Sequence, residues 1–175
     1  GSYPTSYIPT YGSSVTRSQD TSSVTNVDFF PNGEGTAFIE FEIDEASISG
    51  YPELFRIYNP SDATNFLYCY IFEQDAGDVK VGYRLDINNI REIESSSSIA
   101  LGTNKLSVRL QRGAYTAYLN GAEIPPPQTH NDVADTNMTT LRIWSQLFIA
   151  DERIKQFATF SATLTDSECI ALTTI

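Results

Sequence analysis

Aromatic and arginine residues recur at alternate positions of several short apolar segments. In the segment 66–72 (FLYCYIF), the aliphatic and thiol side chains alternate with Phe and Tyr, and successive side chains of a strand point to opposite faces. If the aliphatic residues face the interior, the same alternation turns one set of residues outward: Arg56, Tyr58, Tyr68, Tyr70, Arg84, Arg109 and Trp144. A sugar ring stacks its C–H face on an aromatic ring, and its hydroxyls accept hydrogen bonds from guanidinium groups. These residues are therefore candidates for carbohydrate binding.

The outward residues also fit two roles that involve no sugar. The aromatics could pack beneath loops or against a second subunit. The arginines could simply pair with the carboxylates that the chain carries in excess. The sequence leaves these alternatives open.

Three carboxylates, Glu40, Glu42 and Asp44, share one face of a predicted strand. Retaining glycosidases use two carboxyl groups about 5 to 5.5 Å apart. Residues i and i+2 of a strand lie roughly 6.5 to 7 Å apart, so such side chains could reach that separation. A solvated acidic strand face accounts for the trio more simply, and we expect a protein without catalytic residues.

Two loops are rich in oxygen ligands of the kind that calcium prefers. One contains Asp132 and Asp135, flanked by Asn131 and Asn137, and the other covers residues 86–89. Neither follows a defined calcium-loop pattern, so ordinary turns are the alternative. The single histidine, His130, has no partner for a zinc site. We expect no required cofactor, with calcium at Asp132 and Asp135 as the weaker hypothesis.

The elements that would position these residues are predicted to be strands. Residues 101–121 (LGTNKLSVRLQRGAYTAYLNG) alternate on both sides of a turn at Gly113, which predicts a β-hairpin with one buried face. Further alternating segments are Gly35–Asp44, Leu54–Asn59, Asn65–Glu73, Val79–Asp86, Thr140–Ser145 and Glu152–Phe160. The pattern predicts an all-β sandwich or barrel.

Two segments depart from the strand pattern. Three consecutive prolines at 125–127 predict a surface loop over residues 125–137. Only Thr165–Thr173 favours a helix, where Thr165 and Glu168 form a capping box.

Composition narrows the classes of partner. A net charge of −11 argues against nucleic acid and anionic membranes. No run approaches the roughly 18 apolar residues of a membrane span. The two cysteines, Cys69 and Cys169, are expected to be buried free thiols, which favours assembly in a reducing cytoplasm. Residues 1–2 look like an expression scar, and we expect residues 3–175 to form one domain.

Four stretches, spread over nearly the whole chain, carry a family resemblance. They are SYIPTYGSSVTR (residues 6–17), GEGTAFIEFE (33–42), the hairpin at 101–121 and RIKQFATFSATLTDSECIAL (153–172). Together they resemble the concanavalin A-like (laminin G-type) jelly-roll domains of phage tail fibre and tail-associated proteins. The resemblance implies two curved antiparallel sheets with a carbohydrate-binding face, and calcium at the rim in many members. Laminarinase-like glucanases of this fold carry an E-x-D-x-E or E-x-D-x-x-E strand. Glu42 and Asp44 match the first half of this pattern, but its second Glu would fall at Ala46 or Ser47, and neither is acidic.

The resemblance also implies a function. We expect a non-catalytic domain that binds a host-surface glycan, in a virion protein that acts outside the cell and has a homotrimeric parent. One alternative is a carbohydrate-binding module of a secreted bacterial enzyme that degrades polysaccharides. Another is a structural or decoration domain that uses the same face as a protein interface. The identity of the glycan stays open.

Overall fold

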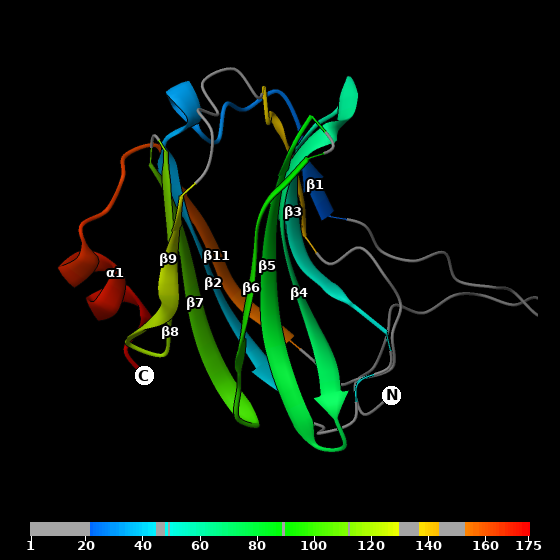
Figure 1. Ribbon diagram of the computed structural model, residues 1–175, viewed down its shortest axis with the longest axis vertical. Coiled ribbons are helices and arrows are strands. Elements are labelled where there is room, and N and C mark those ends of the chain that lie inside the picture. The colour runs from blue at the N-terminus through cyan, green and yellow to red at the C-terminus, as the bar shows by residue number, and fades with distance from the viewer. Residues whose placement is uncertain are drawn as a thin grey trace, which may run out of the picture.

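The computed structural model describes residues 22–44, 48, 50–88, 90–111, 113–129, 137–143 and 153–175. Two antiparallel sheets face one another, and one short helix lies outside them (Figure 1). The predicted all-β jelly-roll sandwich is therefore confirmed. Trp144, His130, Asp132, Asp135 and the first matching stretch (residues 6–17) lie outside the described residues.

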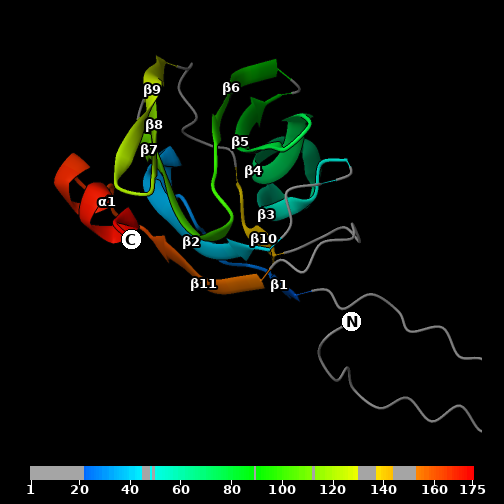
Figure 2. The same cartoon turned by 90° about the horizontal axis from the view of Figure 1, so that it is seen from below.

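The described strands divide into a six-stranded and a five-stranded sheet. In spatial order, the six-stranded sheet consists of β1 (Ser22–Val24), β10 (Thr140–Ile143), β3 (Glu53–Asn59), β4 (Asp62–Asp75), β5 (Asp78–Ile87) and β6 (Ile90–Ser98). The five-stranded sheet consists of β11 (Arg153–Phe160), β2 (Gly35–Ile43), β7 (Gly102–Gln111), β8 (Ala114–Leu119) and β9 (Ala122–Thr129). A short 3-10 turn, η1 (Pro31–Gly33), precedes β2. Seen end-on, the sheets form two layers (Figure 2).

The core lies between the sheets and follows the alternation of the strands. Ile57 and Leu67 of the six-stranded sheet and Ile39 and Val108 of the five-stranded sheet are fully buried in one apolar cluster. Burial of this apolar surface drives the two sheets together. Cys69 and Cys169 are buried free thiols, as predicted.

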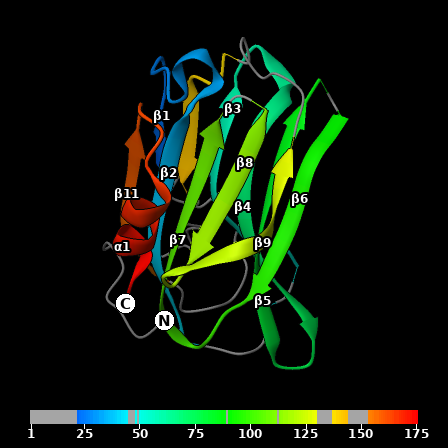
Figure 3. The same ribbon diagram turned by 60° about the vertical axis from the view of Figure 1, so that its left-hand side comes forward.

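The helix α1 (Asp166–Thr173) packs against the outer surface of the five-stranded sheet, next to β7 and β8 (Figure 3). Its predicted capping box is present, because Thr165 Oγ1 accepts from the Glu168 amide and Glu168 accepts from the Thr165 amide. None of the described helices is long and apolar enough to cross a membrane.

One local prediction is wrong. The proline run at 125–127 does not begin a surface loop but lies within β9. Because β9 is an edge strand of its sheet, one side of its backbone needs no ladder partner, and proline is tolerated there.

Candidate functional site

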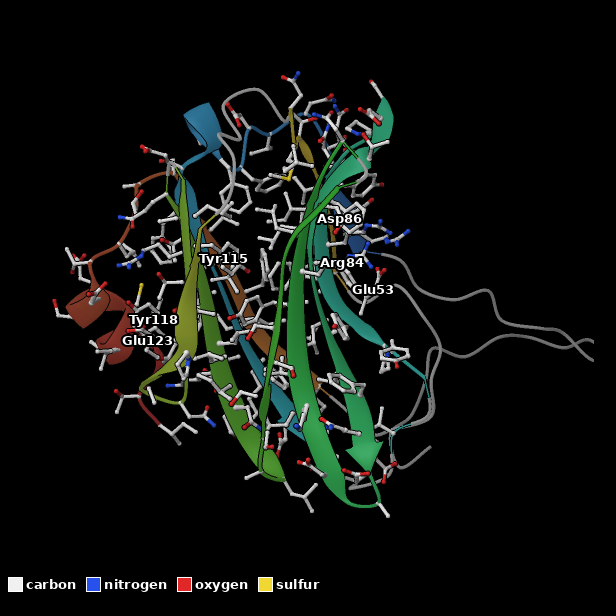
Figure 4. All side chains as sticks on the ribbon, in the orientation of Figure 1. Glu53, Arg84, Asp86, Tyr115, Tyr118 and Glu123 are labelled. Carbon is white, nitrogen blue, oxygen red and sulfur yellow. The ribbon has the colours of Figure 1, made fainter. Side chains whose placement is uncertain are left out.

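A row of four long side chains crosses the outer face of the six-stranded sheet. Arg142 of β10 lies opposite Arg56 of β3, Arg56 lies opposite Tyr68 of β4, and Tyr68 lies opposite Arg84 of β5. Directly paired residues in antiparallel strands have Cβ atoms about 5 Å apart, so the four form a continuous row. Figure 4 shows Arg84, with Glu53 and Asp86, on the side of this sheet that faces away from the other sheet.

We call this surface the aromatic–arginine face. It comprises the row and the side chains on either side of it: Tyr51, Glu53, Arg56, Tyr58, Phe66, Tyr68, Tyr70, Phe72, Arg84, Asp86 and Arg142.

Aromatic rings follow β4 along this face because alternate residues of a strand share a side. The centroids of Tyr68 and Tyr70 are 4.8 Å apart in a stacked arrangement, and Phe66 and Phe72 extend the line at 5.7 and 5.6 Å. Tyr51, which precedes β3, lies against Tyr70 and Phe72 and is 62% exposed. The result is an apolar platform at one end of the face.

Tyr70 faces outward as predicted but is only 4% exposed. Its ring lies directly over Gly82 of β5, where a Cβ atom would come within 2.5 Å of the ring. Tyr51, Tyr68 and Phe72 flank the ring. Tyr70 therefore supports the platform from below rather than offering an open surface.

The arginines of the face are held by rings and carboxylates. The Arg56 guanidinium carbon lies 4.3 Å from the centroid of the Phe66 ring, and that of Arg142 lies 6.0 Å from the Tyr58 centroid. The carboxylate of Glu53 lies between them, 3.0 Å from Arg142 and 3.6 Å from Arg56. Stacking and ion pairing together fix the direction of each guanidinium.

Arg84 is held differently. Its Nε and Nη2 both donate to the buried carboxylate of Asp86, two residues along β5. This bidentate pair neutralises Arg84 within the sheet.

Arg109 does not belong to this face, which corrects the prediction that it lies exposed beside the other arginines. It lies on β7 of the five-stranded sheet, is only 8% exposed and is covered by the C-terminal segment. Its Nη1 donates to the Leu164 carbonyl oxygen at 3.1 Å and to Asp166, and its Nη2 donates to Thr116 Oγ1 at 3.3 Å. Alternation places a residue on the outer side of its own sheet without indicating which sheet that is.

The contacts of Arg109 fasten α1 to the sheet. The hydroxyl of Tyr118 also donates to Asp166, at 2.8 Å. Hydrogen bonds from Tyr118 and Arg109 lower the pKa of Asp166, and burial is the largest cause that raises the pKa of Tyr118. Favourable bonding to the ionised form accounts for the shift of Asp166.

The acidic trio lies on one side of the five-stranded sheet, and two of its members, Glu42 and Asp44, pair with cations of β11. Lys155 Nζ lies 3.1 Å from Glu42, and Arg153 Nη2 lies 3.2 Å from Asp44. These pairs fit the interpretation of a solvated, charged strand face.

No metal-binding group is present in the described part of the chain, where no three acidic, histidine or cysteine residues gather. Asp86, in the second predicted oxygen-rich loop, is instead paired with Arg84. The calcium hypothesis for Asp132 and Asp135 concerns residues outside the described ranges and stays a prediction.

The set of binding residues predicted from alternation omits several members of the face, among them Glu53, Arg142 and Tyr51. The position of Arg142 between Leu141 and Ile143 carries the same alternating signal as its predicted neighbours, so it could have been found. Tyr51 lies outside any strand, and only tertiary packing brings it onto the platform.

Comparisons with known proteins show the fold. No protein-family model matches the chain, and no curated protein sequence matches it. Among solved structures, the CBM40 of the Ruminococcus gnavus IT-sialidase superposes with a TM-score of 0.62 and 16% identity, over 82% of this chain and 84% of that one. The same module has also been solved bound to α2,3 sialyllactose.

Two larger proteins contain a similar domain. The leech intramolecular trans-sialidase matches with a TM-score of 0.63 and 13% identity, over 83% of this chain and 24% of that one. The binding domain of botulinum neurotoxin DC, solved with rat synaptotagmin II, matches with a TM-score of 0.60 and 14% identity, over 81% of this chain and 35% of that one. The chain thus spans about a quarter of the leech enzyme chain. These similarities show a β-sandwich fold shared with binding domains, while the link to phage tail fibres stays a prediction.

Proposed function

We propose that this protein is a non-catalytic carbohydrate-binding domain whose ligand lies on the aromatic–arginine face. The observation that carries the proposal is the row formed by Arg142, Arg56, Tyr68 and Arg84, which combines stacking surfaces with hydrogen-bond donors on one open sheet. The fold supports it, because the Ruminococcus gnavus module with the same fold has been solved with a bound sialyllactose.

Each group has a defined task in this binding. The half-exposed rings of Tyr58, Tyr68 and Phe72, and the exposed ring of Tyr51, offer surfaces on which the C–H faces of sugar rings stack. The guanidinium groups of Arg56 and Arg142 donate hydrogen bonds to sugar oxygens. Tyr70 keeps the platform flat.

For the parent protein, we propose a phage tail fibre or a similar virion protein that acts outside the cell on a host-surface glycan. The resemblance of residues 153–172 to the closing segment of such domains supports this context. A homotrimeric parent would present several copies of a weak site, and linked copies bind far more tightly than one.

A second candidate is a module of a secreted bacterial enzyme that degrades polysaccharides. One comparison favours this candidate: in the leech enzyme, a domain similar to this chain makes up about a quarter of a longer chain. The binding face would be the same, and only the neighbouring domain would differ.

A glycan array with the wild type and Tyr68→Ala tests the proposal. We expect the wild type to bind a restricted set of glycans, and Tyr68→Ala to bind them at least about tenfold more weakly, which corresponds to ~1.4 kcal/mol. Glu42→Gln, on the other sheet, is the matched control and should bind like the wild type.

Two results would contradict the proposal that this protein is a non-catalytic carbohydrate-binding domain. If no glycan binds and the domain self-associates through a contact that Tyr68→Ala breaks, the face is a structural interface. If the wild type releases reducing ends from a polysaccharide and Glu42→Gln does not, the protein is an enzyme.

A further inference from the structure

Two guanidinium groups lie side by side at one end of the aromatic–arginine face. Arg142 and Arg56 are directly paired in register, and their side chains are 33% and 27% exposed. Like charges directly opposite one another destabilise a sheet. Among the described residues, one carboxylate, that of Glu53, pairs with the two arginines, which leaves one positive charge in excess. This local excess occurs in a protein with a net charge of −11.

Most hydrogen-bond donors of this pair have no acceptor among the residues that the structure describes. Each guanidinium carries five N–H donors. Within the described part of the chain, the pair makes one hydrogen bond, from Arg142 Nη2 to Glu53 Oε2, since Arg56 lies 3.6 Å from Glu53. The Nε atoms of both arginines are buried and have no hydrogen-bond partner in the described ranges. Buried donors are normally satisfied, so we expect an acceptor here that the described residues do not supply.

Thr140 is a further incompletely bonded residue at this end of the face. It lies on β10 two residues before Arg142, on the same side of the sheet and opposite Tyr58. It is only 3% exposed, yet its Oγ1 has no hydrogen-bond partner among the described residues. A polar side chain and two incompletely bonded cations therefore gather at the same end of the face.

We propose that Arg56, Arg142 and Thr140 form a subsite for an anionic oxygen group of the glycan, either the carboxylate of an acidic sugar or a sulfate ester. This inference rests on the proposed carbohydrate-binding function and names the class of ligand. The planar guanidinium fork matches two anionic oxygens, and the rings of Phe66 and Tyr58 hold the two forks in place. Adjacent sugar rings extend over Tyr68 toward Tyr51 and Phe72.

The other arginine of the row shows why the subsite lies at this end. Both donors of Arg84 that face Asp86 are bonded to its carboxylate, so its charge is already compensated. A bound anionic group is stabilised most beside Arg56 and Arg142, because these two cations share a single carboxylate, that of Glu53.

The experiment compares matched pairs of probes by isothermal titration calorimetry. The pairs are 3′-sialyllactose with lactose, and oligogalacturonate with its methyl ester, and a heparin oligosaccharide represents sulfate esters. We expect the charged member of at least one pair, or the heparin probe, to bind about tenfold or more tightly than neutral probes. A hydrogen bond to a charged group typically contributes enough free energy to change affinity about tenfold or more. The sugar and sulfate arms show which anion the subsite takes.

Removing a positive side chain should weaken binding of an anionic probe, and removing the neighbouring carboxylate should strengthen it. Arg142→Gln and Arg56→Gln should each weaken binding of the anionic probe about tenfold, a larger loss than either variant causes for a neutral probe, because only the anionic probe loses a charge-assisted contact. Arg142→Lys should retain part of the binding. Glu53→Gln should strengthen anionic binding several-fold, since it removes the resident carboxylate. Arg153→Gln removes one positive charge from the other sheet and is the control, with thermal unfolding as the check on folding of every variant.

The outcomes separate the two proposals. Equal affinity for charged and neutral probes, or an unchanged affinity in both glutamine variants, overturns the anionic subsite while carbohydrate binding stands. Absence of binding to every probe and to the glycan array overturns both.

Discussion

The contact between Gly82 and Tyr70 allows a sharp test of how the aromatic platform is built. A Cβ atom at Gly82 would lie 2.5 Å from Tyr70 Cζ and 2.7 Å from Cε2. Carbon atoms pack best about 3.5 to 4.0 Å apart, so in Gly82→Ala the ring has to move by about 1 Å or more. The ring is buried between Tyr51, Tyr68 and Phe72 and has little room to do so.

The expected effect of Gly82→Ala on the free energy of unfolding has opposite signs in the wild type and in Tyr70→Val. In the wild type, overpacking should lower the free energy of unfolding by about 1–3 kcal/mol. In Tyr70→Val, where the ring is gone, the same substitution should raise it by about 0.5–1 kcal/mol, because alanine restricts the unfolded chain more than glycine does. The coupling energy between the two positions is therefore about 1.5–4 kcal/mol.

Urea unfolding of the wild type, both single variants and the double variant measures this coupling. Gly77→Ala is the matched control, since Gly77 has a φ of +84° and open space around it. It should cost about 1 kcal/mol in either background, for a backbone reason alone. If Gly82→Ala costs the same with and without the Tyr70 ring, the ring contact is not what selects glycine, and the reasoning fails. Glycan affinity should fall in Gly82→Ala, since Tyr68 stacks on the displaced ring.

Three further predictions concern the other sheet and the core. Arg109→Met should lower the free energy of unfolding by about 1–2 kcal/mol and speed amide exchange in α1, with glycan binding unchanged; unchanged exchange would contradict the anchoring role of Arg109. The folded-state pKa of Asp166 is lowered, so its contribution to stability is present above the usual value of 3.8 and is lost as the pH falls through the lowered value. The stability difference between wild type and Asp166→Asn should therefore shrink on acidification below about pH 4, and a constant difference would refute this. Burial raises the pKa of the Cys69 and Cys169 thiols, so a thiol reagent should label both only in denaturant; rapid labelling of the folded protein would contradict their burial.

The sequence by itself determined the fold class and the side of each strand. Alternation in residues 66–72 assigns Leu67 and Cys69 to the core and Tyr68 to the outside, because a strand sends successive side chains to opposite faces whatever lies around it. The capping box of α1 is equally local, since its partners Thr165 and Glu168 are three residues apart. Such features depend only on near neighbours in the chain, so a pattern can predict them.

Only the tertiary structure decided which outward residues lie together. Arg109 and Arg142 carry the same alternating signal, yet one fastens a helix on the five-stranded sheet and the other joins Arg56 on the six-stranded sheet. The register that pairs Arg142 with Arg56, and the placement of Tyr70 over Gly82, depend on contacts between distant segments. Alternation repeats identically in every strand, so it carries no information about which strand becomes the neighbour.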